Sequence, residues 1–355
     1  MAAGGLLGTL LLALGSVCLT SGCSSIAYYA QAAGGHLDLM RRARPVPEVL
    51  ADAATPPALR DRLQQSQRMR DFAVSELKLP DNNSYRRYAD LQREAVVWNV
   101  VAAPELSLTL KTWCFPVLGC VGYRGYFTRA GADALAAQLR ADGLEVSVYG
   151  VPAYSTLGWS NWVGGDPLLN TFVNWPEGEL ARLIFHELSH QVAYADDDTT
   201  FNESFATAVE RIGGRRWLTQ QASAAARAEY EALEQRRADF RAFTLRWRGE
   251  LDALYRSGLP DAVQRERKAA LMTAMRAEYA LMKADRWGGY AGYDGWFARA
   301  NNASFAVLAA YNGLVPEFER LFERSGTDFP RFYAEVRRLA ALPKAQRRAE
   351  LGAPP

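Results

Sequence analysis

The sequence contains little histidine and little cysteine, with three histidines and four cysteines among 355 residues. So few cysteines give no basis for a zinc site built from thiolates. Lys and Arg (41) nearly balance Asp and Glu (39), so the chain has no basic stripe for nucleic acid and no acidic tail. Internal repeats are also absent. Charge therefore identifies no partner, and the scarce residue types show where chemistry is to be sought.

Residues 1–22 form an apolar run with the length of a signal-peptide core, and small residues end it just before Cys23. The letters "LTSGC" resemble a bacterial lipobox, which predicts cleavage before Cys23 and lipidation of that cysteine. An ordinary secretory signal or a retained membrane anchor would fit the same run. All of these interpretations place the remaining chain outside the cytoplasm. The lipobox predicts an outer-membrane lipoprotein that faces the periplasm, attached to the membrane through its N-terminal lipid.

The two cysteines of the folded part flank "CFPVLGC", in which Pro116 and Gly119 can turn the chain back on itself. In an oxidising compartment we expect Cys114 and Cys120 to form a short-loop disulfide. Two free buried thiols are the alternative.

The pattern of apolar residues changes along the chain. Residues 24–92 show helical spacing, 94–103, 106–113 and 144–151 have strand composition, and 129–143 form a short helix between them. No convincing strand follows residue 214, and helices are expected at 220–256, 261–285, 301–314 and 330–342. We therefore predict an α+β, mostly helical fold, with a small mixed β-sheet before a histidine-bearing helix and a helical C-terminal half.

This pattern divides the chain into four parts. They are a signal peptide (1–22), an N-terminal helical segment (23–92), a core with sheet and histidines (93–218), and a helical C-terminal subdomain (219–355).

Two of the three histidines lie four residues apart in the segment 176–195, "PEGELARLIFHELSHQVAYA". The segment is expected to be helical, because Pro176 suits a first turn and Asn174 with Glu177 would form a capping box. Residues four apart share a helix face, so His186 and His190 should point the same way.

These residues form an HExxH motif, in which two neutral imidazoles bind zinc and the glutamate takes a proton from the water that zinc binds. Glu187 is the predicted general base. The same pattern also arises by chance in proteins without metal.

A catalytic zinc has three protein ligands and one open position. The remaining histidine, His36, lies before the predicted sheet, so we expect a carboxylate as the third ligand. Glu203 begins a second helix, on which it shares a face with Thr207 and Glu210, and the turn "ADDDTT" would fold this helix back against the histidines. The alternative is a solvated carboxylate at a helix start.

The segment "NESFATAVE" resembles the "NEGFAxYxE" segment of gluzincin-class zinc aminopeptidases, in which the first glutamate is the third zinc ligand. Over most of the mature chain, "YYAQAAGGHLDLMRRARPVPE", "TWCFPVLGCVGYRGYF", "GVPAYSTLGW", "HELSHQ" and "DTTFNESFATAVE" resemble the bacterial family of predicted aminopeptidase lipoproteins. The resemblance implies a zincin-like fold, one Zn²⁺ per chain held by His186, His190 and Glu203, and a peptide substrate. The chain departs from the gluzincin pattern in two ways: the gap of 12 residues between His190 and Glu203 is shorter, and the GxMEN exopeptidase motif is absent. Cleavage from the amino end and internal cleavage thus both stay open.

Further residues are candidates for the cleft. Tyr154 and Ser155 follow a strand that would pair with a substrate backbone, although a purely structural strand end fits equally. With no spare histidine, a tyrosine or arginine must stabilise the oxyanion, and Tyr311 is our choice, followed by Tyr290 and Tyr293; each would otherwise be a packed aromatic. Residues 196–198 are aspartates that would support a ligand histidine or cap the next helix.

Two classes of function fit these features. The first is a zinc peptidase of the cell envelope, and the second is a lipid-anchored binding or assembly protein on an inactive zincin scaffold. The enzyme is favoured because Glu187 binds no metal and would not be needed at a structural zinc site. The sequence does not indicate the oligomeric state.

Overall fold

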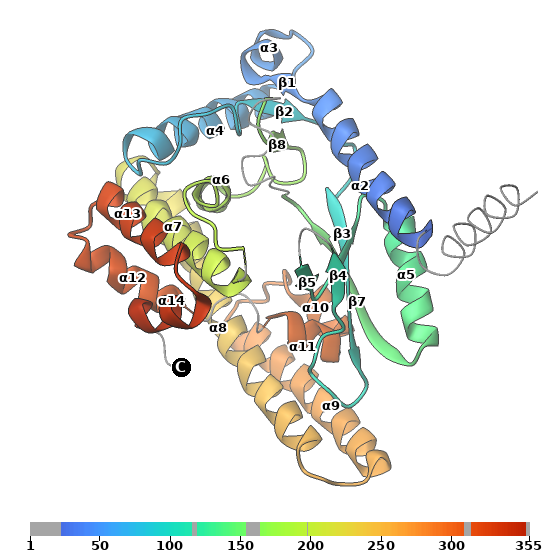
Figure 1. The fold of residues 1–355 in the computed structure, drawn as a ribbon. Helices are drawn as coiled ribbons and strands as arrows, with labels where there is room; N and C mark the ends of the chain where they lie inside the picture. Colours follow the sequence, from blue (N-terminus) through green and yellow to red (C-terminus); the bar gives the residue numbers. More distant parts are fainter. Residues whose placement is uncertain (1–22, 116–118, 154–163, 197, 309–313, 353–355) are drawn as a thin grey trace, which may run out of the picture.

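The computed structural model describes residues 23–115, 119–153, 164–196, 198–308 and 314–352 (Figure 1). Most of these residues are helical, and the strands form small sheets, so the α+β, mostly helical prediction is confirmed; its zincin-like character stays a prediction. The helices are α2 (Cys23–Arg42), α3 (Val46–Ala51), α4 (Pro57–Ser75), α5 (Arg129–Ala141), α6 (Glu177–Ser189), α7 (Thr199–Gln220), α8 (Ala224–Tyr255), α9 (Asp261–Asp285), α10 (Asp294–Arg299), α11 (Asn302–Leu308), α12 (Val315–Arg324), α13 (Phe329–Ala340) and α14 (Lys344–Leu351).

The described strands form three small sheets, one of which, β1-β2-β8, is mixed. Their bounds are β1 (Arg44–Pro45), β2 (Arg87–Ala89), β3 (Val97–Pro104), β4 (Trp113–Phe115), β5 (Gly119–Val121), β6 (Arg124–Tyr126), β7 (Leu144–Val151) and β8 (Leu168–Leu169). The order β6-β3-β7 is antiparallel throughout, with Asn99 opposite Tyr149. Parallel pairing occurs only between β2 and β8 among the described strands, in the sheet β1-β2-β8.

The sheet β6-β3-β7 is covered by helices on both faces. Because side chains alternate along a strand, Val100 and Ala102 of β3 pack against α5, whereas Val101 and Ala103 pack against α11. Figure 1 shows α5 and α11 on opposite sides of β3 and β7. Both faces of the sheet are therefore apolar and packed against helices.

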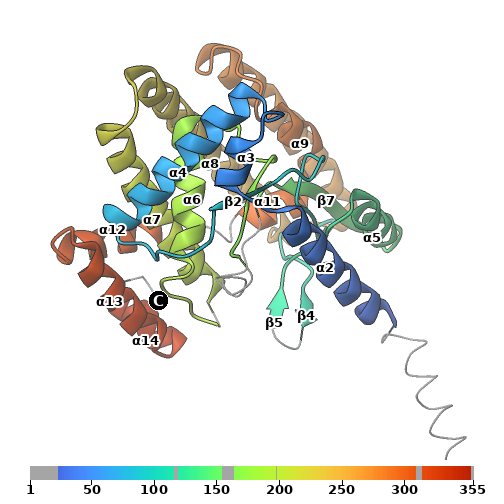
Figure 2. The same ribbon diagram turned by 90° about the horizontal axis from the view of Figure 1, so that it is seen from above.

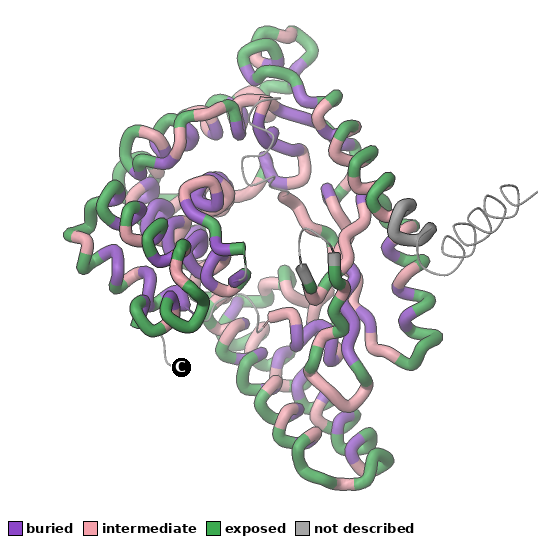
Figure 3. Tube along the Cα trace, viewed as in Figure 1, coloured by how far each residue is buried: buried purple, intermediate pink, exposed green. Residues whose placement is uncertain are grey.

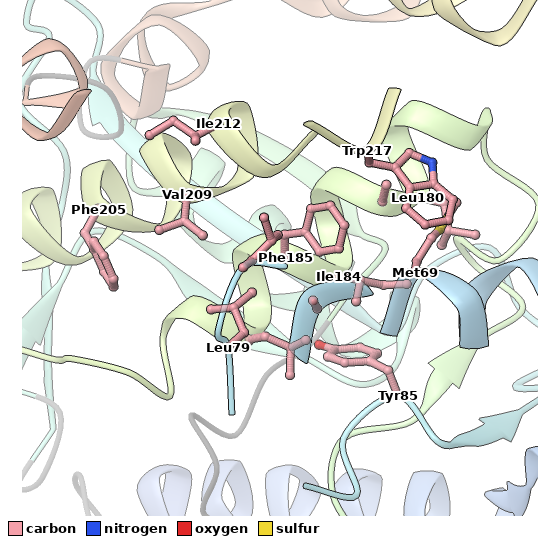
Figure 4. Packing of buried hydrophobic residues seen from close by; sticks show 14 of the residues in the cluster. Met69, Leu79, Tyr85, Leu180, Ile184, Phe185, Phe205, Val209, Ile212 and Trp217 are labelled. Carbon is pink, nitrogen blue, oxygen red and sulfur yellow. The ribbon is translucent and has the colours of Figure 1, made fainter. Parts of the chain in front are cut away.

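Helices α6 and α7 form the centre of the main hydrophobic core. Leu180, Ile184 and Phe185 of α6 are fully buried and belong to one cluster with Phe205 and Val209 of α7 (Figure 4). Figure 3 shows this concentration of buried residues in the helices around α6. The same cluster extends from Leu39 of α2 to Leu351 of α14. Helix α14 thus shares a core with helix α2. The predicted domain boundaries stay a prediction.

Helices α8 to α11 enclose a second, aromatic cluster. Phe240, Phe243 and Trp247 of α8 pack there with Tyr279 of α9 and Phe297 of α10. Seen from above, α8 and α9 extend away from the α13–α14 end of the molecule (Figure 2).

Three local predictions were wrong. Residues 106–113 do not form a strand, since β4 begins only at Trp113; Leu108 and Leu110 instead pack on the aromatic cluster and on the β3–α11 cluster, respectively. Residues 76–92 are not helical and include β2. The Asn174 capping box is absent, because Pro176 is the N-cap of α6 without a side-chain hydrogen bond.

Cys114 and Cys120 form the expected disulfide, directly opposite each other in the β4–β5 hairpin. Within the ranges that the structure describes, no helix is long and apolar enough to cross a membrane.

Candidate metal centre

Helix α6 presents two histidines on a face beside its buried stripe. Leu180, Ile184 and Leu188 face the core with no exposed surface, and this stripe fixes the rotation of the helix. His190 is the C-cap residue and keeps αR backbone angles (φ −59°, ψ −20°), so the helical spacing from His186 persists. The two ring centroids lie 4.9 Å apart.

The turn after α6 is fixed by two polar side chains. The amide of Asn202 bonds Ala195 in both directions, accepting from its N–H at 2.8 Å and donating to its carbonyl at 2.8 Å. Asp198 caps α7 by accepting from the N–H of Phe201 at 3.1 Å. The turn therefore directs the start of α7, and with it Glu203, back toward α6.

Glu203 contacts both histidines. Its Oε2 lies 3.4 Å from Nε2 of His186, and its Oε1 lies 3.8 Å from Nε2 of His190, while the two Nε2 atoms are 3.2 Å apart. His190 is buried, and the side chains of His186 and Glu203 are 17% and 26% exposed. The three donors are thus gathered at a site to which solvent has partial access.

The spacing of the three donors matches what one four-coordinate metal ion requires. Zinc takes imidazole nitrogen and carboxylate oxygen at about 2.0–2.2 Å, so two donors on a tetrahedral ion lie about 3.3 Å apart. The observed separations of 3.2, 3.4 and 3.8 Å are close to that value. Among the described residues, these are the His, Cys, Asp and Glu side chains whose geometry could hold a metal.

Glu210 lies two turns after Glu203 on α7 and contacts His186 at Nδ1, the ring nitrogen that faces away from Glu203. Its Oε2 lies 2.8 Å from Nδ1 of His186, and its Oε1 accepts from Arg182. Burial by itself would raise the pKa of Glu210, but the interactions with Arg182 and His186 have the larger effect and lower that pKa to about 2. Glu210 is therefore ionised at any physiological pH.

The two histidines differ in their electrostatics. Burial lowers the pKa of His186, but hydrogen bonds with Glu203 and Glu210 outweigh it and raise that pKa well above the usual value. Burial, together with the charge on His186, lowers the pKa of His190 to about 4.

The charge of Glu203 contributes to the raised pKa of two tyrosines. Burial, Tyr149 and then Glu203 raise the pKa of Tyr123, which follows β5, to about 12. Burial and then Glu203 raise the pKa of Tyr194, which follows His190 by four residues. Both side chains are partly exposed. Sequence reasoning missed both.

The other predicted residues lie in several places. Tyr154, Ser155 and Tyr311 fall outside the described residues. Tyr290 and Tyr293 pack in the aromatic cluster of α8 to α11.

The three aspartates at 196–198 differ in their surroundings. Residue 197 is not described, Asp196 is exposed, and Asp198 is a helix cap that also pairs with Arg347 and Arg348. Glu210, and not an aspartate, contacts the outer nitrogen of His186.

Comparison with known proteins gives one match. No curated protein and no solved structure is similar to this chain. A model of the family described as "Putative aminopeptidase" matches residues 27–351. Because this match covers most of the sequence, the chain belongs to the "Putative aminopeptidase" family.

Proposed function

We propose that the protein is a zinc-dependent peptidase. The observation that carries the proposal is the convergence of His186, His190 and Glu203, whose donor atoms all lie within 4.8 Å of one another. Two imidazoles and one carboxylate leave a fourth position open, which is the arrangement of catalytic rather than structural zinc. The family description supports a peptide as substrate.

Bound zinc would supply Lewis acidity, polarising the scissile carbonyl and making a water molecule more acidic. Glu187 follows His186 on α6, and its charge contributes to the raised pKa of both His186 and the buried Tyr85. Glu187 is the general base in this proposal: it accepts a proton from the attacking water and returns it to the leaving amine. A carboxylate in that place has no function at a purely structural zinc.

The developing oxyanion needs a hydrogen-bond donor beside the metal donors. Tyr123 and Tyr194, both partly exposed and both with a pKa that the charge of Glu203 helps to raise, are two residues to test for this role. Tyr311 stays a prediction for the same role.

The substrate would lie extended beside the sheet. Strand β7 is an edge strand of the order β6-β3-β7 in the described part of the chain, and Tyr154 and Ser155 follow it. An edge strand can pair with a peptide backbone through main-chain hydrogen bonds, which suits substrates of many sequences.

We propose a location at the cell envelope, with lipid attached to Cys23 and the protein held at the periplasmic face of the outer membrane. The "LTSGC" motif supports this. A fatty-acid probe should label the wild-type protein, and label that persists in Cys23→Ala would refute the anchor.

The deciding experiment compares the wild-type protein with Glu187→Gln on a mixed peptide library, with zinc measured in the same samples. Glutamine has nearly the same shape but cannot take a proton, so zinc should stay near one per chain while the rate falls by at least ~10²-fold. Glu177→Gln on the same helix is the matched control, because glutamine can still accept from Nε1 of Trp217. An unchanged rate in Glu187→Gln would refute the mechanism. Full zinc without any cleavage by the wild-type protein would favour a binding or assembly protein.

A further inference from the structure

A chain of charged side chains begins at His186 and leads away from the metal donors. Glu210 uses both of its oxygens: Oε2 lies 2.8 Å from Nδ1 of His186, and Oε1 accepts from Nη2 of Arg182. The Arg182 side chain is 7% exposed and that of Glu210 is 14% exposed. An ionic contact so shielded from solvent has a defined geometry, unlike an ion pair at the surface.

Arg182 is held in turn by helix α8. Its Nη1 donates to Oε1 of Glu234 at 2.8 Å. Arg237, one turn further along α8, donates to the same oxygen of Glu234 at 2.6 Å and to both oxygens of Glu179 on α6, at 2.8 and 2.9 Å. The chain therefore connects α7, α6 and α8.

Close packing at two glycines keeps α8 against these groups. A Cβ on Gly178 would meet the Tyr230 ring at 2.5 Å, and a Cβ on Gly214 would meet Cγ of Arg182 at 2.9 Å. The ring of Tyr230 also lies 5.7 Å from the guanidinium carbon of Arg182. Arg182 is thus enclosed by the ring of Tyr230, by the carboxylates of Glu179, Glu210 and Glu234, and by the α7 backbone at Gly214.

The geometry at His186 has a chemical consequence. An imidazole that offers Nε2 to a metal must carry its proton on Nδ1, and a carboxylate at Nδ1 selects that tautomer and fixes the ring plane. The second oxygen of Glu210 is occupied by Arg182, so the carboxylate cannot turn away from His186.

We propose that Glu210 and Arg182, held by Glu234 of α8, are positioning residues that orient His186 for metal binding. This inference rests on the proposed zinc centre and deepens it, because it makes metal affinity depend on a helix that contributes no ligand. A merely structural network would change stability and leave the zinc affinity of the folded protein unaltered.

Glu210→Gln is the central variant. Glutamine has one acceptor oxygen and one NH₂ group, so it cannot accept from His186 and Arg182 together. If its oxygen serves Arg182, its NH₂ faces Nδ1 and favours the tautomer with the proton on Nε2, which cannot bind metal. Loss of such a partner typically weakens metal binding by about 10- to 100-fold. We expect a decrease of that size, measured by competition with a chelator of known affinity.

Variants of Arg182 and Glu234 separate positioning from folding. Arg182→Lys keeps the positive charge and should retain more zinc affinity than Arg182→Met. Glu234→Gln, at a side chain that is 27% exposed, should fold normally and weaken zinc less than Glu210→Gln does. The matched control is Arg215→Gln on α7, which removes an exposed pair with Glu319 of α12 and should leave zinc affinity unchanged.

A second readout does not depend on activity. The chain has three histidines, so imidazole-labelled protein gives few ¹⁵N signals. In zinc-loaded wild-type protein, Nδ1 of His186 should carry a proton that is donated to Glu210, and the ¹⁵N signal of Nδ1 should shift in Glu210→Gln. Wild-type protein without stoichiometric zinc would refute the metal centre itself. Normal wild-type binding, with unchanged zinc affinity and an unchanged Nδ1 signal in zinc-loaded Glu210→Gln, would refute the positioning residues alone.

Discussion

Asp198 offers a sharp test of how α7 is held. Its side chain is 1% exposed, accepts from the N–H of Phe201, and pairs with Arg347 at 3.3 Å and with Arg348 at 2.6 Å. Removing one partner of a buried pair costs about 3–5 kcal/mol. Arg347 keeps three backbone carbonyl partners, so for Asp198→Asn we expect a loss of unfolding free energy near the lower end, about 3 kcal/mol. Asp198→Ala also loses the cap and should cost ~1 kcal/mol more.

This loss should depend on pH. Burial raises the pKa of Asp198, but the bonds from Arg348 and Phe201 outweigh it and lower that pKa below its usual value. A carboxylate with a lowered folded-state pKa stabilises fully above about pH 4, the unfolded-state value, and this stabilisation is lost as the pH falls through the folded-state pKa. Urea unfolding of Asp198→Asn and wild-type protein should therefore differ most at pH 7 and least at the lowest pH at which both fold. Asp133→Asn, in an exposed pair with Arg129, is the control and should cost less than about 1 kcal/mol. A difference below 1 kcal/mol at pH 7, or one that does not shrink on acidification, would refute the reasoning.

The remaining predictions concern the core and the hairpin. Phe185→Ala removes a fully buried ring between α6 and α7 and should lower the unfolding free energy by about 3–5 kcal/mol in urea, whereas Leu281→Ala, which is 64% exposed, should change it by less than ~0.5 kcal/mol. Similar losses for both would contradict the assigned core. Replacing Cys114 and Cys120 by serine should cost about 2 kcal/mol, given the short loop they close. Mass spectrometry after non-reducing alkylation should find no free thiol at either position in the wild-type protein, and two free thiols would contradict the disulfide.

The sequence predicted the elements whose signals are local. Strong apolar spacing and the four-residue interval of the histidines placed the helix that became α6, and Asn202 and Asp198 mark the turn into α7. Glu203 was expected against the histidines because a short turn leaves an antiparallel return as the simple arrangement.

The features that depend on distant partners were not predictable. The loop after α4 contains Lys78 and Tyr85 at positive φ, and the buried guanidinium of Arg70 holds it by bonds to the carbonyls of residues 80, 82 and 84. The neighbouring sequence does not predict those bonds, so the helical prediction was extended past the end of α4. The alternating leucines at 106–110 likewise indicated a strand, but they reach two different clusters from a loop.

Glu210 illustrates the same limit within the site. Its spacing of seven from Glu203 placed both on one face of α7, yet its contact with Nδ1 of His186 depends also on Arg182 of α6 and, through it, on α8. A single sequence identifies the donors that a motif spaces, but not the residues that orient them.

X-ray absorption at the zinc edge of tag-free wild-type protein tests the central claim most directly. The described donors predict one zinc per chain, with two imidazoles at about 2.0 Å and oxygen in the remaining positions. His190→Ala should lose most of the metal, because the one histidine outside the motif, His36, lies on α2 rather than beside the donors. A sulfur shell around the zinc, or a His190→Ala protein with full zinc and an unchanged spectrum, would contradict the proposed metal centre.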